Sequence, residues 1–328
     1  MRQLFLGVDA GATKTHALLL DGQCAAVGFG EAGSGSHEVV GYDRARESIA
    51  ECVERALRSG RTTKEAVGYA CYCLAGADVA SDFEEIPPRL IEPVTGSIPH
   101  LLKNDSFGCL RGGTRDPYGV MVNCGTGQVA VGRNREGREI RLGGYGFEYG
   151  DLTGGGVITY QAVTAVVRAY DGRGEPTALV DLIFDASGTK TVPDFIDRTY
   201  RNEELVMSLG IAPLVFKASR AGDRVARRIV LDAAREMAVT ATTLIRRLEM
   251  QSDEFDVVAA GSVFKGEDPV FMETIEREVH SVAPRARLRT PLYSPVVGAA
   301  LLALEAAGAT ATDEMYGRLE ETLPGELK

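Results

Sequence analysis

Tryptophan is absent from this sequence, and histidine occurs only four times. The six cysteines are Cys24, Cys52, Cys71, Cys73, Cys109 and Cys124. They include no C-x-x-C pair and have no histidine partner at zinc-site spacing, so neither a zinc site nor a disulfide framework is predicted. Cys71 and Cys73 share one face of an expected strand, which favours buried thiols over iron–sulfur ligands. We therefore expect reduced cysteines and a cytoplasmic compartment.

Positive charge is in deficit. The chain has 36 lysines and arginines against 46 aspartates and glutamates, and its formal net charge is −10. A nucleic-acid-binding surface needs clustered lysine and arginine to neutralise phosphates, so nucleic acid is not an expected partner. Any phosphate is expected to be held by backbone amides and a metal ion rather than by a cluster of lysine and arginine side chains.

Long hydrophobic runs are also missing. The most apolar run, Pro295 to Leu304, is about half the length of a membrane span. The N-terminal apolar stretch, Leu4 to Val8, is too short for a secretory signal. No membrane partner is therefore predicted. With 328 residues, of which 45% are apolar, the chain is long enough to bury the cores of two domains.

The order of elements is repeated along the chain. Each half begins with strand, glycine turn and strand, and continues with further strands and helices. The expected strands are 3–8, 15–20, 24–29, 67–74, 98–103, 118–134 with its turns, 255–263 and 286–290. The expected helices are 43–58, a short one after 105, 155–170, 176–186, 193–200, 221–250, 269–282 and 295–307. This order predicts two α/β lobes with mixed sheets, residues 1–112 and 113–328.

The first glycine turn lies in "LFLGVDAGATKTHALLL", residues 4–20. Gly11 lacks a Cβ and permits close approach, Thr13 and Thr15 carry hydroxyl donors, and Lys14 adds a positive charge. Asp9 would repel a bare phosphate, but it suits a Mg²⁺ ion that lies between carboxylate and phosphate. One alternative is an ordinary tight hairpin.

The second glycine turn is Gly125-Thr126-Gly127, in the equivalent position of the second half. Neither turn has the Walker A pattern or the G-x-G-x-x-G fingerprint. Two such turns in equivalent positions, the first with Asp9 beside it, favour a clamp for nucleotide phosphates over two unrelated hairpins.

Six segments occur in a characteristic order: "GVDAGATKT", "KNDSFG", "NCGTGQ", "GGYGFEYGD", "AAGSV" and "SPVVGAALLAL". In this order they resemble the sugar kinase, heat-shock ATPase and actin superfamily, most closely the branch of N-acetylglucosamine kinases and BadF/BadG/BcrA/BcrD ATPases. The resemblance implies two ribonuclease-H-like, actin-like ATPase lobes with ATP and Mg²⁺ in the interlobe cleft. It also implies that the last helix, at about 295–307, returns toward the N-terminal lobe.

The same resemblance assigns ligand contacts by position. Those to ATP fall on Gly11, Ala12, Thr13, Lys14, Thr15, Gly125, Thr126, Gly127, Gly261 and Ser262, and the contact to the metal falls on Asp9. For a sugar, the resemblance gives Tyr145 and Asp151 in the loop 143–151, and Glu148 suits a sugar by its chemistry. The further candidates are Ser36, His37, Asn104 and Gly144. A solvated histidine is the alternative for His37, and a connecting loop with a helix cap at Asp151 is the alternative for the loop. Two positions depart from the related kinases, in which an asparagine is common near Ser36 and Glu-Gly-Ser commonly follows the position of Asp151.

Asp105 follows an apolar strand at the opening of a helix, in "LLKNDSFG". Asparagine and aspartate there are typical of a helix N-cap. A carboxylate in this place can also accept the proton of a sugar hydroxyl during phosphoryl transfer, the role that the resemblance gives to Asp105. The two interpretations are compatible, because a residue at a helix start is held in a fixed position.

Three functions remain open at this point. The first is an ATP-dependent sugar kinase that acts on an amino sugar or a related hexose, with Asp105 as general base. The second is an ATPase that acts as a regulator or activator through lobe closure, without a sugar product. The third is a nucleotide-binding structural protein of the actin type. A homodimer is expected from the resemblance alone.

Overall fold

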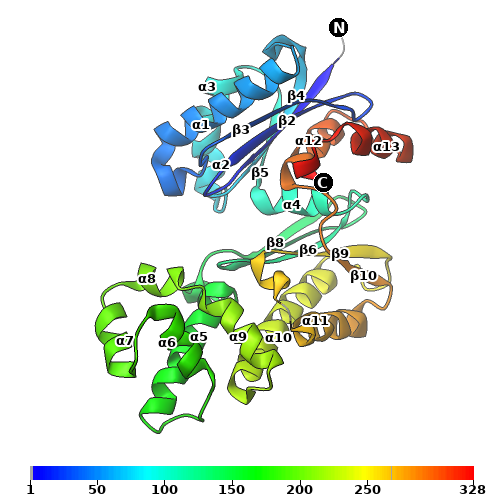
Figure 1. The fold of residues 1–328 in the computed structure, drawn as a ribbon. Helices are drawn as coiled ribbons and strands as arrows, with labels where there is room; N and C mark the ends of the chain where they lie inside the picture. Colours follow the sequence, from blue (N-terminus) through cyan, green and yellow to red (C-terminus); the bar gives the residue numbers. More distant parts are fainter. Residues whose placement is uncertain (1–2, 267) are drawn as a thin grey trace. The chain divides into compact units, whose positions relative to one another are not determined.

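The computed structural model describes residues 3–266 and 268–328 and divides into two compact units (Figure 1). Unit 1 comprises the chain up to Met121 together with Thr290–Lys328, and unit 2 is Val122–Arg289. The lobes expected from the sequence, 1–112 and 113–328, stay a prediction about domains. No helix in the described ranges combines the length and apolarity that a membrane span requires.

Unit 1 contains a five-stranded mixed sheet in the order β3-β2-β1-β4-β5. The strands are β1 (Leu4–Ala10), β2 (Thr15–Asp21), β3 (Ala26–Ala32), β4 (Val67–Leu74) and β5 (His100–Asn104). β1 pairs antiparallel with β2 and parallel with β4, which pairs parallel with β5. The carboxyl ends of β1, β4 and β5 therefore meet at one edge of the sheet, where ligands of open α/β sheets commonly bind.

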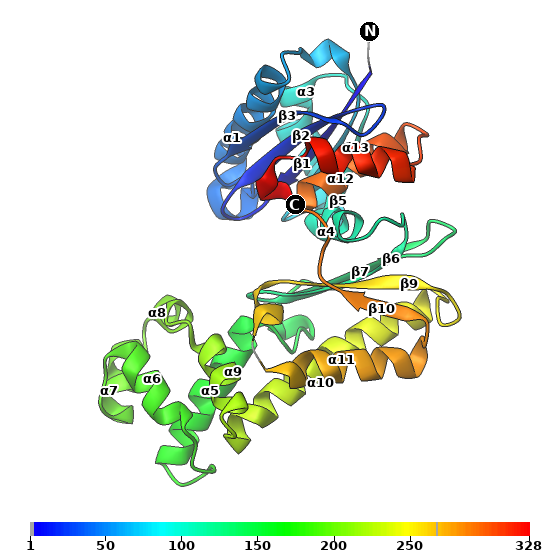
Figure 2. The same cartoon turned by 45° about the vertical axis from the view of Figure 1, so that its right-hand side comes forward.

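Helices cover both faces of this sheet (Figure 2). One face carries α1 (His37–Ser59), α2 (Ala80–Ile86), the π-helical turn η2 (Pro87–Ile91) and α3 (Glu92–Thr95). The other carries α4 (Asp105–Gly113), α12 (Pro295–Ala306) and α13 (Asp313–Thr322). Short 3₁₀ turns are η1 (Lys64–Ala66) and η5 (Gly325–Leu327). Because both faces are buried, the central strands read as almost continuous apolar runs.

Unit 2 contains a second five-stranded sheet in the order β10-β9-β6-β7-β8. The strands are β6 (Gly119–Cys124), β7 (Gln128–Arg133), β8 (Glu139–Gly143), β9 (Phe255–Ala260) and β10 (Ala286–Arg289). The helices are α5 (Gly155–Tyr170), α6 (Leu179–Ser187), α7 (Val192–Thr199), α8 (Glu203–Ser208), α9 (Ile211–Arg220), α10 (Arg224–Arg247) and α11 (Pro269–Val282), with 3₁₀ turns η3 (Phe147–Tyr149) and η4 (Ser262–Lys265). The helices of unit 2 gather on one face of its sheet (Figure 2).

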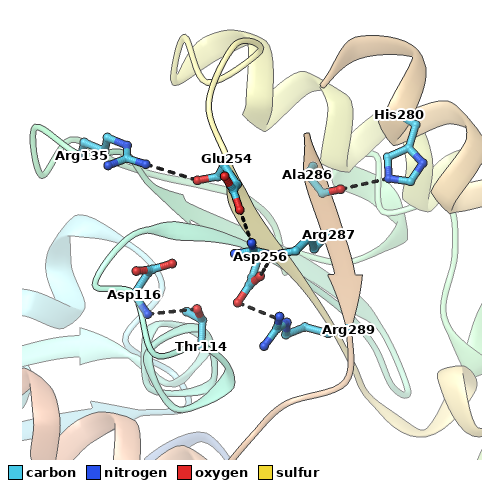
Figure 3. Close-up of polar contacts among 9 residues, drawn as sticks. All are labelled: Thr114, Asp116, Arg135, Glu254, Asp256, His280, Ala286, Arg287 and Arg289. Atoms are coloured by element: carbon cyan, nitrogen blue, oxygen red, sulfur yellow. Dashed lines mark hydrogen bonds and ion pairs between the residues drawn. The ribbon is translucent and has the colours of Figure 1, made fainter. Parts of the chain in front are cut away.

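Ion pairs connect the edge strand β10 to β9 and the residue before it (Figure 3). The buried carboxylate of Asp256 lies 3.0 Å from Nε of Arg287 and 3.2 Å from Nε of Arg289. Arg287 also pairs with Glu254. A four-residue parallel strand has few ladder hydrogen bonds, so these ion pairs help to hold its register.

The expected α/β class with two mixed sheets is confirmed. The cysteines are unpaired, and all are buried except the half-buried Cys109. The strand expected at 24–29 lies instead at Ala26–Ala32. The shift arises because the Asp21 carboxylate accepts the N–H groups of Gln23 and Ala25, and Cys24 adopts a left-handed conformation, which lengthens the turn.

Several helices were not predicted. No helix is expected from the sequence in the segment that holds α2, η2 and α3, although η2 and α3 each carry a proline in their first two positions, where proline is tolerated. The other unpredicted helices are α8, α9 and α13. α1 begins at His37 rather than near 43, and Gly41 interrupts it with φ 76° and ψ 162°.

Helix α12 is packed unusually closely on both of its neighbours in unit 1. A Cβ added to Gly7 of β1 would lie 2.2 Å from the backbone N of Ala300. A Cβ added to Gly298 would lie 2.0 Å from the carbonyl oxygen of Gly108 and 2.4 Å from the backbone N of Gly112 on α4. The backbones of β1, α12 and α4 are therefore in direct contact, which only glycine permits at these points.

We predict that Gly298→Ala lowers the free energy of unfolding by about 1–3 kcal/mol or more, because the added methyl group meets the α4 backbone, which cannot move aside like a flexible side chain. Gly317→Ala is the matched control. Gly317 is exposed within α13 and has no atom within 4 Å of an added Cβ, so this change should add about 0.5–1 kcal/mol. Urea unfolding measures both, and equal effects of the two would contradict the close contact.

Candidate functional site

The first glycine turn connects β1 and β2 and is closed by a hydrogen bond from Gly11 N–H to the Lys14 carbonyl at 3.0 Å. Residues 12–14 are exposed, as a ligand-binding turn requires. Thr15 is buried, and its hydroxyl donates to the Gly33 carbonyl at 2.8 Å. Gly35 N–H donates to the Gly11 carbonyl at 3.3 Å. The turn is thus tied to the loop that precedes α1.

Asp9 lies two residues before this turn, and its carboxylate is influenced by that of Asp105. The pKa of Asp9 is raised to about 7, chiefly by burial and next by the negative charge of Asp105, while Lys14 opposes the rise. The pKa of the Cys109 thiol, one turn along α4, is raised to about 12 by burial and by both carboxylates. Two carboxylates that interact this strongly form a place where a cation would be stabilised.

Asp105 is the first residue of α4, and Asn104 supplies the N-cap. The Asn104 side-chain oxygen accepts the N–H of Ser106 at 3.1 Å, and its amide donates to Asp78 at 2.7 Å. The capping expected at this pair therefore belongs to Asn104, which is buried and held by these bonds. Asp105 is left with its carboxylate at the helix opening. Asp78 follows β4 and was not singled out from the sequence.

Ser36 and His37 open α1 beside the turn. Ser36 is buried, although its side chain makes no cap hydrogen bond. The His37 ring stacks on Tyr42 at 4.5 Å between ring centroids, and the Arg89 guanidinium lies 3.4 Å from the centroid of the Tyr42 ring. Gly76, with φ 87°, lies against His37, because an added Cβ would be 2.7 Å from its ring.

The carboxyl edge of the unit 1 sheet therefore gathers several of the predicted site residues. Ala75 N–H donates to the Ala10 carbonyl at 2.9 Å, so the loops that follow β1 and β4 run side by side. Leu74 is paired in register with Asn104. Asp9, residues 11–15, Ser36, His37, Asn104 and Asp105 all belong to this edge or to the loop tied to it.

The second glycine turn, in unit 2, is fixed against the start of α5. Gly125 N–H donates to the Gly127 carbonyl at 2.9 Å, while Gly155 and Gly156 donate to the carbonyls of Gly125 and Thr126 at 2.7 and 2.9 Å. Gly154 has φ 124°, and an added Cβ would lie 2.7 Å from the Thr126 carbonyl. The shape of this turn therefore depends on glycines of two segments.

Gly261 brings the third predicted nucleotide segment to the same end of the unit 2 sheet. It has φ 100°, and an added Cβ would lie 2.4 Å from the Cys124 carbonyl, directly before the second turn. Ser262 begins the 3₁₀ turn that follows. The residues of unit 2 expected to bind ATP thus lie next to one another.

The loop 143–151 is folded around the side chain of Asp151. This buried carboxylate accepts the N–H groups of Tyr145 and Gly146 at 2.7 and 2.6 Å and the side-chain amide of Gln128 at 3.3 Å. Asp151 therefore ties the loop to the residue after the second turn. Gln128 was not predicted to take part, although its place directly after Gly127 was a signal.

Three other residues predicted to contact a sugar, Gly144, Tyr145 and Glu148, lie in this loop. Tyr145 and Glu148 are exposed, and the Arg141 guanidinium lies 4.7 Å from the centroid of the Tyr145 ring. Gly144 has φ 81° and packs on Val129. An exposed aromatic ring beside a carboxylate suits a sugar, which offers both a C–H face and hydroxyl groups.

No cluster of three or more histidine, cysteine or acidic side chains is placed for a metal within the described ranges. This does not conflict with Mg²⁺, which keeps several waters and is commonly held by one or two carboxylates and substrate phosphates. The Asp9–Asp105 pair fits that requirement, since the negative charge of Asp105 raises the pKa of Asp9.

Comparison with known proteins gives three informative relatives. An N-acetyl-D-glucosamine kinase of Dictyostelium discoideum is 27% identical over 92% of this chain and 98% of its own length. An N-acetylmuramic acid/N-acetylglucosamine kinase of Clostridium acetobutylicum is 28% identical over 91% and 97%. The structure of a ROK hexokinase of Thermus thermophilus matches with a TM-score of 0.61 at 20% identity, over 94% of this chain and all of that one.

The structural likeness supports the two-lobed fold of actin-like sugar kinases. The sequence comparison goes further, because one family model matches residues 6–303, nearly the whole length. The chain therefore belongs to the BadF/BadG/BcrA/BcrD ATPase family.

Proposed function

We propose that this protein is an ATP-dependent kinase that phosphorylates a hydroxyl group of an amino sugar or a related hexose. The observation that carries the proposal is the position of Asp105, at the opening of α4 and in electrostatic contact with Asp9 beside the first glycine turn. The names of the two relatives that span nearly the whole chain, both amino-sugar kinases, support the same reaction.

In the proposed reaction Asp105 is the general base. A sugar hydroxyl is a weak nucleophile, and a carboxylate within hydrogen-bond reach orients it and accepts its proton. The hydroxyl oxygen forms a bond to the γ-phosphorus of ATP as the bond from that phosphorus to the bridging oxygen breaks, which leaves ADP. Asn104 holds the start of α4 through its cap and through Asp78, and so fixes the base.

The proposed ATP contacts are those expected from the sequence, and each set is described within its own unit. Residues 11–15 of unit 1 and 125–127 of unit 2 are the proposed phosphate contacts, and Gly261 and Ser262 are the proposed adenosine contacts. Backbone N–H groups in glycine turns suit anions in a chain with net charge −10, which has no excess of basic side chains to offer.

Mg²⁺ is the proposed metal, near Asp9. When bound, such an ion would supply positive charge to offset the negative charge that develops during transfer. Asp9 would hold it directly or through water, and Lys14 lies near enough to lower the pKa of Asp9. An anionic nucleotide could then approach the two carboxylates without repulsion.

The proposed sugar contacts are Ser36, His37 and Asn104 in unit 1, and Gly144, Tyr145, Glu148 and Asp151 in unit 2. Asp151 contributes by holding the sugar loop in shape, because its carboxylate already accepts three hydrogen bonds. A homodimer and a cytoplasmic location stay predictions from the sequence.

A regulatory ATPase without a sugar product is the second candidate, and the two curated relatives do not favour it. We expect ADP release that depends on one of glucosamine, N-acetylglucosamine, N-acetylmuramic acid or glucose, measured with a coupled assay. Hydrolysis at the same rate with and without every sugar would overturn the kinase proposal.

Asp105→Asn should keep ATP binding and lower turnover by about two to four orders of magnitude, because the amide orients the hydroxyl but cannot accept its proton. Binding is checked by the rise in melting temperature with a non-hydrolysable ATP analogue. Asp43→Asn, at an aspartate whose side chain is 84% exposed on α1, is the matched control and should keep wild-type turnover. Near-normal turnover of Asp105→Asn would remove Asp105 from the mechanism.

Asp9→Asn should stabilise the ligand-free protein in a pH-dependent way. The pKa of Asp9 is about 7 in the folded chain against its usual 3.8, so folding takes up a proton between about pH 4 and pH 7. The free energy of unfolding therefore falls as the pH rises through this window, by about 4 kcal/mol at most.

The asparagine has no such cost, so its advantage should grow from about pH 4 to pH 7 and then stay constant. Urea unfolding in the presence of EDTA measures this difference across pH. A difference between the two proteins that does not change with pH would show that Asp9 ionises freely.

A further inference from the structure

The far end of α4 is held by one buried arginine. The Arg111 side chain is 4% exposed, and its Nε donates to Glu305 of α12 at 2.7 Å. Its Nη1 donates to the Thr114 carbonyl at 3.0 Å and its Nη2 to the Tyr316 hydroxyl of α13 at 2.7 Å. One guanidinium thus joins three helices within unit 1.

These bonds fix the orientation of α4 as well as its distance from its neighbours. The contact through Gly298 lets α4 and α12 approach closely, but a contact between smooth glycine backbones offers little resistance to rotation of α4 about its own axis. The planar guanidinium donates in several fixed directions to groups outside α4, so Arg111 adds directional bonds to the contacts that set this rotation. Asp105, at the other end of the same nine-residue helix, rotates with it.

The two proposed catalytic carboxylates are thereby linked through α12. Asp9 lies two residues after Gly7, at which β1 touches Ala300 of α12. Asp105 lies on α4, which touches α12 at Gly298 and is bonded to it through Arg111 and Glu305. α12 therefore adds to the pairing of β1, β4 and β5 a second connection between Asp9 and Asp105.

We propose that Arg111, with Glu305 and Tyr316 as its partners, is a positioning residue that orients the carboxylate of Asp105 for proton transfer. The inference rests on the proposed function, since it needs Asp105 as the base. It makes the C-terminal helix α13 a part of the machinery that sets the rate of the chemical step, although α13 supplies no residue predicted to touch ATP or sugar.

Stability alone is a weak reason for such a pair. Taking two charges out of water costs about as much as their attraction returns, and apolar side chains of similar volume often replace a buried ion pair without loss. Apolar side chains cannot reproduce the fixed directions of these hydrogen bonds. We therefore assign the Arg111–Glu305 pair the role of orienting α4.

The test uses Arg111→Met/Glu305→Met, in which both charges are removed together so that neither is left buried alone. We expect kcat to fall about tenfold to a hundredfold, because small misplacements of a catalytic group cost rates of this size. The KM values for ATP and sugar should stay within about threefold, since the substituted side chains are buried within unit 1 and are not among the proposed ligand contacts.

Arg115→Met/Glu320→Met is the matched control. This ion pair, 2.6 Å long, also fastens α13 but is about half exposed and does not involve a side chain of α4. It should leave kcat unchanged. An equal loss of kcat in this control would assign the effect to general loosening of α13 and overturn the inference.

The decisive measurement repeats Arg111→Met/Glu305→Met in the Asp105→Asn background. If Arg111 acts through Asp105, the added substitutions should lower kcat by less than about twofold there, a non-additivity that a purely structural role would not give. A further loss as large as in the wild-type background would contradict the inference. Full turnover of Asp105→Asn alone would instead overturn the proposed function.

Discussion

The direct contact of backbones at α12 is the constraint on which the rest of unit 1 depends. Gly7 allows α12 to lie on the sheet, and Gly298 allows α4 to lie on α12. At these two points no side chain separates the elements, so the distances there are set by the van der Waals radii of backbone atoms. Because backbone atoms in contact cannot move closer together, these contacts restrict the position of α4 relative to β1.

Electrostatics adds a cost at the same place. Burial opposes the ionisation of Asp9, and the negative charge of Asp105 adds to this opposition. A protein that brings two carboxylates together without a cation loses stability near neutral pH. The cost is reasonable if the pair is built for a bound metal and nucleotide, which would return the lost free energy on binding.

The parts that could be predicted from the sequence are those whose determining residues lie within a few positions of one another. Asp9 and the turn after it combine a strand, a glycine and hydroxyl residues within a few positions, and Asp105 follows its strand directly. The class of fold could be predicted for the same reason, because the alternation of apolar runs and glycine turns is local.

What could not be predicted depends on contacts between distant residues. The N–H groups that surround the Asp151 carboxylate exist only once loop 143–151 has folded back, and the role of Asp78 depends on a neighbouring strand. α13 was missed because its apolar residues Met315, Tyr316 and Leu319 are few and Gly317 interrupts them. Its burial against Arg111 is visible only in three dimensions.

The break of α1 at Gly41 has a practical meaning for substrate choice. The backbone leaves the helical conformation there, so the turn that carries His37 is a separate piece from the long amphipathic segment that follows. The buried residues of α1 all lie beyond the break, from Ala45 to Leu57. Residues 37–39 can therefore be exchanged for those of another family member with little repacking, whereas Val40 packs against the core of unit 1. His37, a proposed sugar contact, lies in the exchangeable part of this turn.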